Sequence, residues 1–98
     1  MITTDEIKTL LQKNKKRLVN ELNQSKELVS LLKKSTHEKL SNKEKEQLKN
    51  QLLDVLKTIP ALAIFLLPGG LILLPLVAKI LPDILPSAFS TEDEDSLN

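Results

Sequence analysis

Residues 59–78 read IPALAIFLLPGGLILLPLVA, which is the longest stretch of the chain without a polar side chain. None of its 20 residues has a charged, amide or hydroxyl side chain, and twelve of them are Leu, Ile, Val or Phe. A straight helix of this length spans about 30 Å, which is the thickness of the hydrocarbon core of a bilayer. The twelve large apolar residues favour membrane insertion by about 4 to 7 kcal/mol. The stretch, which lies between Lys57 and Lys79, therefore predicts a membrane segment.

The predicted membrane segment is interrupted by three prolines, which lack a backbone N–H and disfavour helix at the preceding residue: Pro60, Pro68 and Pro75. The strongest break is the central triplet Pro68-Gly69-Gly70. Two geometries are compatible with such a break. One is a single kinked span, and the other is a re-entrant helical hairpin with arms at residues 57–67 and 71–81.

The alternative to a membrane segment is a hydrophobic hairpin buried inside a water-soluble helical protein. A segment that is apolar all round needs neighbours on every side, and the helices expected upstream have narrow apolar faces. We therefore expect lipid, rather than protein, to surround residues 59–78. Residues 81–86, LPDILP, cannot be regular helix throughout and are expected at the membrane interface. The acidic residues 90–98, STEDEDSLN, are expected to be a disordered tail.

The polar first part of the chain predicts two amphipathic helices. Thr3-x-x-Glu6 and Ser41-x-x-Glu44 both fit a capping box, so we expect helices over about 4–34 and 42–58. The apolar stripe of the first helix contains Ile7, Leu10, Leu11, Leu18, Leu22, Leu28, Val29 and Leu32. The stripe of the second contains Leu48, Leu52, Val55, Leu56 and Ile59, and it runs directly into the apolar stretch.

The expected fold class is all-α, with two amphipathic helices followed by a proline-broken membrane helix or re-entrant hairpin. Asn14 and Ser25 are polar residues within the stripe of the first helix. The two amphipathic helices are expected to pack as an antiparallel pair beside the membrane. The chain then divides into a polar helical region at 1–57, a membrane segment at 58–89 and the acidic tail at 90–98.

Charge is distributed unevenly along the chain and restricts the possible functions. Residues 1–57 carry 13 Lys and Arg against 8 Asp and Glu, although no pattern typical of a DNA-binding helix is present. Such a basic flank favours the cytoplasmic side of a membrane and weakly binds anionic headgroups. With no cysteine and the single histidine His37, the sequence offers no catalytic set, metal site or cofactor motif. We expect no enzymatic activity.

A second pattern lies between residues 40 and 89. Before the apolar stretch it comprises Leu40-Ser41, Glu44-Lys45, Gln47-Leu48, Asp54 and Lys57-Thr58-Ile59-Pro60. Within and after the stretch it comprises Pro68, Leu74-Pro75, Lys79, Leu81-Pro82-Asp83 and Leu85-Pro86-Ser87-Ala88-Phe89. In residue type and in the spacing of its prolines, this pattern resembles the leucine-zipper/EF-hand-containing transmembrane (LETM) family.

The resemblance implies an integral membrane protein connected with cation homeostasis, through potassium/proton or calcium/proton exchange. It also implies ribosome association. Oligomer formation, or assembly with a larger membrane protein, is expected with Gly69-Gly70 as a point of close helix approach. Because Asp5 and Glu6 occur early without an arginine, we expect a short bacterial relative in the inner membrane; in a eukaryote the mitochondrial inner membrane would be the counterpart.

Leu71 departs from the family pattern, which commonly has an acidic residue at this position. An intramembrane carboxylate is the natural carrier of a proton or cation. The alternative function is therefore a non-transporting membrane anchor or scaffold, whose basic helices bind a partner or lipid headgroups. A small membrane-disrupting peptide of the toxin or holin type is a third hypothesis.

Overall fold

The computed structural model describes residues 2–86 and 88–89, which form helices and no strands. The predicted all-α fold class is confirmed for this part of the chain. The expected tail at 90–98 lies outside the described residues. In chain order the elements are α1 (Thr4–Lys13), α2 (Lys15–Asn23), α3 (Lys26–His37), α4 (Asn42–Lys57), the 3₁₀ helices η1 (Pro60–Leu66) and η2 (Leu71–Leu73), and α5 (Leu74–Ile84).

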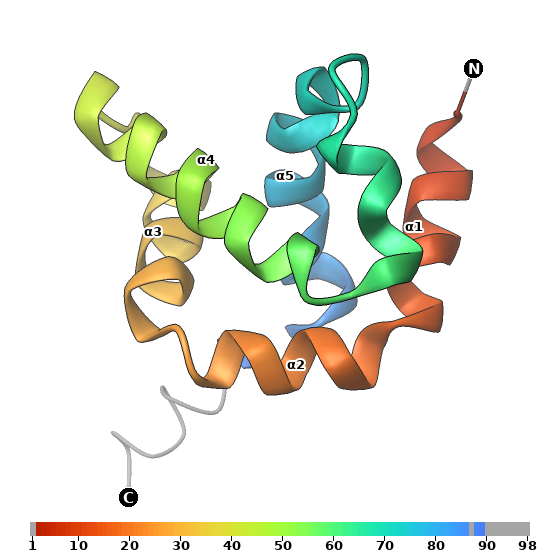
Figure 1. Ribbon diagram of the computed structural model, residues 1–98. Helices are drawn as coiled ribbons and strands as arrows, with labels where there is room; N and C mark the ends of the chain where they lie inside the picture. Colours follow the sequence, from red (N-terminus) through yellow and green to blue (C-terminus); the bar gives the residue numbers. More distant parts are fainter. Residues whose placement is uncertain (1, 87, 90–98) are drawn as a thin grey trace, which may run out of the picture.

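Helix α5 is the centre of the arrangement. Helices α1, α3 and α4 pack around it, and α2 crosses below them to connect α1 with α3 (Figure 1). The Cα radius of gyration is 13.1 Å, close to the value of about 13 Å typical of a folded domain of this length. The apolar segment packs onto the polar helices and shares a core with them.

Both predicted capping boxes are present. The backbone N–H of Glu6 donates to Thr3 Oγ1 at 3.1 Å, and the N–H of Thr3 donates to Glu6 Oε1 at 3.0 Å. The same exchange joins Glu44 and Ser41 at 3.1 and 2.9 Å. These caps satisfy N–H groups that a helix start leaves without partners, so α1 and α4 begin where the sequence indicates.

The prediction of one continuous helix over 4–34 is wrong, because the structure breaks it at Asn14 and Ser25. The Asn14 side chain donates from Nδ2 to the Leu10 carbonyl at 2.9 Å, and its backbone has φ −108° and ψ 19°. Ser25 departs further from helical geometry, with φ −122° and ψ 68°. Short polar side chains compete for backbone hydrogen bonds in this way. The two polar residues of the predicted stripe are thus the points where it bends.

The predicted apolar stripe nevertheless faces the core. Seven of its eight members are buried, and Leu10 is partly buried. From α4, Leu52, Val55 and Leu56 join the same cluster. Arg17 ties α2 to the end of α4 by donating from Nη2 to the Thr58 carbonyl at 3.2 Å.

Protein covers one side of the apolar stretch, contrary to the expectation that the upstream helices are too narrow to do so. The covered side chains share one core with α1, α2 and α3 and include Ile59, Leu62, Phe65, Leu74, Val77 and Ala78, followed by Ile80 and Leu81. The bends at Asn14 and Ser25 explain the difference, because three short helices wrap around the stretch where a single rod would touch one side of it.

Beyond the central break, the chain is more helical than expected. Helix α5 passes through Pro82 and ends at Ile84, so most of residues 81–86 is helix. Pro82 lacks the N–H that would bond to the Ala78 carbonyl, so the last turn of α5 has one backbone hydrogen bond fewer than a regular helix. Leu85 follows in a non-helical conformation, with φ −123° and ψ 51°.

Candidate functional site

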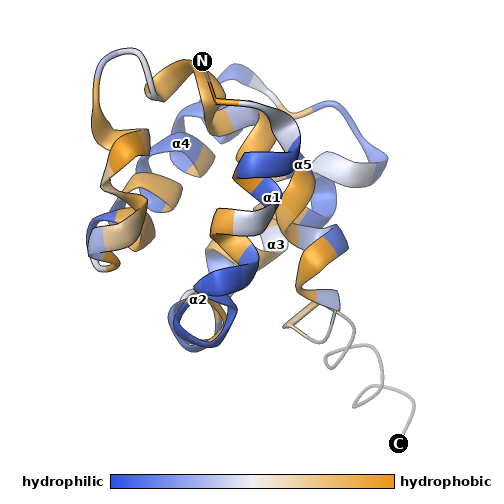
Figure 2. Ribbon diagram, turned by 90° about the vertical axis from the view of Figure 1, so that its right-hand side faces the viewer, coloured by the Kyte–Doolittle hydropathy of each residue, from blue (hydrophilic) through white to orange (hydrophobic). Residues whose placement is uncertain are grey.

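The uncovered side of the apolar stretch forms one exposed surface, which we call the apolar elbow. It runs from η1 through the turn at 67–70 into η2 and the first turn of α5. Its exposed residues are Pro60, Ala61, Ala63, Ile64, Leu67, Pro68, Gly69, Ile72 and Pro75. Figure 2 shows the segment at the upper left, coloured as hydrophobic except at its pale tip. No ionisable residue occurs between Lys57 and Lys79, so the elbow is a continuous apolar surface.

The elbow exposes large side chains, and its turn pairs backbone groups with one another. Ile64, Leu67 and Ile72 are 41, 59 and 78% exposed. Within the turn, the carbonyl of Leu67 accepts from the N–H of Gly70 at 2.7 Å and from that of Leu71 at 3.1 Å. A segment with this combination can enter an apolar medium more easily than an open loop, because hydrocarbon offers no partners to free backbone groups.

The predicted prolines take distinct places around the elbow. Pro60 begins η1, Pro68 lies in the turn and Pro75 occupies the first turn of α5, where a missing N–H is harmless. Pro82 lies inside α5, and Pro86 follows it. Pro60 and Pro75 therefore mark the starts of helices and Pro68 lies in the turn between them, whereas Pro82 lies within a helix.

The charged residues of the predicted set do not meet at a site. Asp54 and Lys57 form an exposed ion pair on α4, with 3.7 Å between Oδ1 and Nζ. Lys79 and Asp83 are exposed on α5. Phe89, the last residue of the predicted motif, is instead buried in the core at 8% exposure.

The two glycines of the break differ in their surroundings. A Cβ atom placed on Gly70 would overlap the carbonyl oxygen of Ile64 and lie 2.9 Å from the Cα of Phe65. A Cβ atom placed on Gly69 would meet nothing within 4 Å. Within the chain, the turn approaches η1 closely at Gly70 and not at Gly69, while the predicted approach to a helix of another subunit stays a prediction.

A groove next to the elbow was not predicted from the sequence. It lies between the first half of α4 and the segment from η2 into α5 and has a volume of about 620 Å³. Its lining residues are Lys45, Glu46, Leu48, Lys49, Leu52, Leu71, Ile72, Leu74, Pro75 and Ala78. The sequence indicates one wall of the groove, because the spacing of Lys45, Leu48, Lys49 and Leu52 places them on one helix face. It does not indicate the other wall, which depends on where α5 packs.

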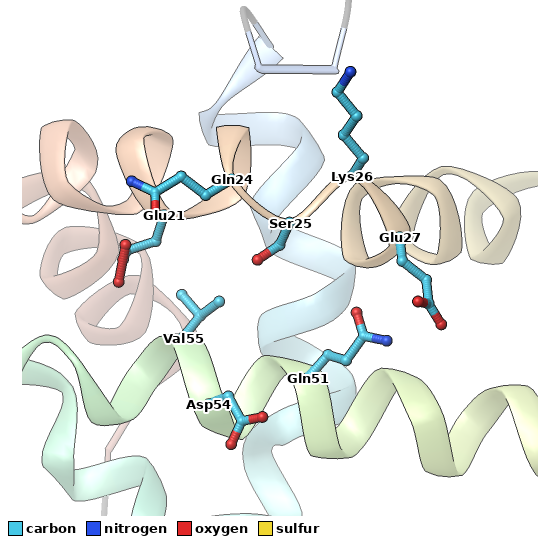
Figure 3. Close-up of a pocket in the computed structure, with 8 residues that line it drawn as sticks. All are labelled: Glu21, Gln24, Ser25, Lys26, Glu27, Gln51, Asp54 and Val55. Carbon is cyan, nitrogen blue, oxygen red and sulfur yellow. The ribbon is translucent and has the colours of Figure 1, made fainter.

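A second, polar groove lies where α2 turns into α3 opposite α4. Figure 3 shows the carboxylates of Glu21, Glu27 and Asp54 at separate places along it, while the amine of Lys26 points away. Among the described residues, no three acidic, histidine or cysteine side chains are placed to hold a metal ion. The side chains of this polar groove therefore resemble those of an ordinary solvent-exposed surface, and they do not point toward one shared binding position.

One ion pair connects the end of α3 with the start of α4. Lys34 Nζ lies 2.6 Å from Glu44 Oε2, and the side chain of Glu44 is 25% exposed. The hydrogen bond from Lys34, together with the one from the backbone N–H of Ser41, lowers the pKa of Glu44 from 4.5 to about 2. The same pair raises the pKa of Lys34. The ion pair thus joins the two helices on either side of the connector at residues 38–41.

The Glu44 pair predicts a pH-dependent stability. The pKa of Glu44 is lower in the folded protein than in the unfolded chain. The stabilisation that its ionised carboxylate gives to the folded state is therefore complete above about pH 5, and it is lost as the pH falls through 4.5 towards 2. Glu44→Gln, which retains a capping acceptor, should melt at a lower temperature than the wild type at pH 7, and the difference should shrink by pH 2. Thermal unfolding followed by circular dichroism measures it. Glu46→Gln is the control, and an equal pH trend in both variants would contradict the assignment.

No single helix in the described part of the chain has both the length and the apolar character needed to cross a bilayer. The segments Pro60–Leu66 and Leu71–Ile84 satisfy the criterion only when taken together, and they are bent by 96° relative to each other. By length and composition, this pair is compatible with a broken span or a re-entrant loop.

Comparison with known proteins gives one finding. A family model described as "LETM1-like, RBD" matches residues 40–98, which is more than half of the chain. The match begins just before α4 and includes η1, η2 and α5. No curated protein and no solved structure matches the chain.

Proposed function

Because this protein belongs to the LETM1-like, RBD family, we propose that it is a membrane-associated module that enters the headgroup layer of a bilayer with its apolar elbow. The polar helices remain outside and present their basic surface. The membrane is a bacterial inner membrane in this proposal, as the family resemblance implies.

The observation that carries the proposal is the exposure of large apolar side chains on one continuous surface. Leu67 and Ile72 extend from the elbow, whereas Phe65 and Leu74 of the same segment are buried in the core. Exposed apolar surfaces of this kind mark sites of membrane or protein contact. A bilayer fits well because interfacial protein segments bury their apolar face about 5 to 10 Å deep, a depth suited to a short elbow. Lys57 and Lys79 flank the elbow and can reach the phosphates.

A non-transporting role is favoured over exchange by this chain alone. The core holds no buried polar or charged residue in the described part of the chain, and position 71 is leucine. Ionisable side chains within membrane segments commonly mark the pathways of protons and cations. We therefore infer an anchor or scaffold as the principal function.

Cation exchange as part of an assembly is the second candidate, and the bent pair of segments favours it. If Pro60–Leu66 and Leu71–Ile84 rearranged into a broken span, a second copy or a larger membrane protein would have to supply the carboxylate. Proton flux into liposomes driven by a potassium or calcium gradient tests this function. Flux at the level of empty vesicles would exclude it for the protein alone.

The elbow predicts a specific loss of membrane binding. Leu67→Glu combined with Ile72→Glu should weaken partition into phosphatidylcholine vesicles at least tenfold, because burying one leucine contributes about 1.5 to 3 kcal/mol. Co-sedimentation with uncharged vesicles measures the effect without attraction to anionic lipid. Asn50→Glu, at an exposed position of α4, adds the same kind of charge away from the elbow and should bind like the wild type. Wild-type protein that remained in the supernatant would refute the proposal.

A further inference from the structure

The groove between α4 and α5 has two chemically distinct parts. Its floor consists of aliphatic side chains, among which Leu52, Leu74 and Ala78 are nearly buried. Its α4 rim carries Lys45 and Lys49, which are exposed and one helical turn apart. Both parts belong to a cavity of about 620 Å³, within the range of about 300 to 1,000 Å³ that is usual for pockets that hold a small molecule.

The charge of the rim selects an anionic ligand. Glu46 also lies on the rim, so the two lysines leave a net charge of +1 there. Residues four apart on a helix lie on the same face, and the two ammonium groups can therefore approach one phosphate from the same side. The floor, in contrast, offers only apolar contact and suits a hydrocarbon chain.

The groove also opens onto the elbow. Leu71 and Ile72 line the groove and belong to η2, which is part of the elbow. Figure 1 shows the start of α4 and the turn between η1 and η2 at the same upper end of the molecule. An elbow resting in the headgroup layer would therefore bring the lysines of the rim to the level of the phosphates.

We propose that this groove binds one anionic phospholipid, with an acyl chain on the aliphatic floor and the phosphate between Lys45 and Lys49. The inference rests on the proposed membrane function and adds a lipid class to it. A diacyl lipid places one chain in the groove and leaves the other in the bilayer beside the elbow. The lipid then links the polar helix α4 to the membrane.

The test uses lipid without a bilayer. Dioctanoyl phosphatidylglycerol, kept below its critical micelle concentration, is titrated into the full-length protein by isothermal calorimetry. We expect saturable binding of one lipid per chain, weakened at least tenfold by Lys45→Glu combined with Lys49→Glu. Dioctanoyl phosphatidylcholine should bind more weakly than the anionic lipid. Lys8→Glu combined with Lys16→Glu makes the same change in net charge at exposed positions of α1 and α2 and should leave the affinity unchanged.

Failure of this inference is distinguishable from failure of the proposed function. If the wild type binds no monomeric phosphatidylglycerol yet still partitions into phosphatidylcholine vesicles through the elbow, only the groove proposal is overturned. Equal affinities in the two double variants would overturn it as well. Sedimentation that showed a dimer, abolished by the groove variant, would identify a second copy as the occupant and also overturn it.

Discussion

Phe65→Ala is expected to lower the free energy of unfolding by about 3 to 5 kcal/mol, the usual loss when a buried phenylalanine is truncated in a packed core. Phe65 is 0% exposed in η1 and belongs to the cluster that the N-terminal helices share. Small domains have total stabilities of about 5 to 15 kcal/mol, so this loss would be a large fraction of the whole. Urea unfolding followed by circular dichroism in detergent-free buffer measures it.

The adjacent residue supplies the control. Ile64 is 41% exposed on the elbow, so Ile64→Ala should alter the unfolding free energy much less than Phe65→Ala. It should, however, reduce binding to phosphatidylcholine vesicles. If Phe65→Ala left stability in buffer unchanged, the apolar stretch would not be packed against the N-terminal helices.

Gly70→Ala is the second substitution with a large expected effect. The added methyl group would overlap the carbonyl oxygen of Ile64, a backbone atom that cannot turn away as a side chain can. Overpacking of this kind destabilises by about 1 to 3 kcal/mol, and occasionally more. The turn would have to move away from η1, which should lower both the urea midpoint and the affinity of the elbow for vesicles.

Gly69→Ala is the matched control for this substitution. Its Cβ atom would meet nothing within 4 Å, and neither glycine has a positive φ angle. Alanine therefore fits the native backbone and restricts the unfolded chain, so Gly69→Ala should be neutral or stabilising by about 0.4 to 1 kcal/mol. Equal destabilisation by the two substitutions would show that the close approach at position 70 is not a constraint on the fold.

The sequence predicts the local features of this fold because each depends on neighbours in the chain. The capping residues Thr3 and Ser41 lie three residues before their glutamates, and the prediction places both helix starts correctly. The apolar stripes and the break at Pro68-Gly69-Gly70 are likewise found where the sequence indicates. Backbone chemistry within a few residues is enough to specify such features.

Features that depend on tertiary packing are predicted less well. Asn14 and Ser25 interrupt the first helix, and the three short helices that result pack around the apolar stretch. The sequence pattern does not distinguish three short helices from one long one, since both keep the same leucines on one face. A leucine covered by protein and a leucine covered by lipid also look the same in a sequence, so composition alone overestimated the part of residues 59–78 that lacks protein cover.

The groove between α4 and α5 was missed for a similar reason, because Lys45 and Ala78 come to line the same groove only in the folded chain.

The wrapping of α1, α2 and α3 around the apolar stretch also has a consequence for biosynthesis. All three helices precede Ile59 in the chain, so the ribosome releases them before the hydrophobic residues that they shield. Chains begin to fold from the N-terminus during translation, at about 5 to 20 residues per second. The hydrophobic segment therefore leaves the ribosome after the three helices that cover one side of it in the folded chain.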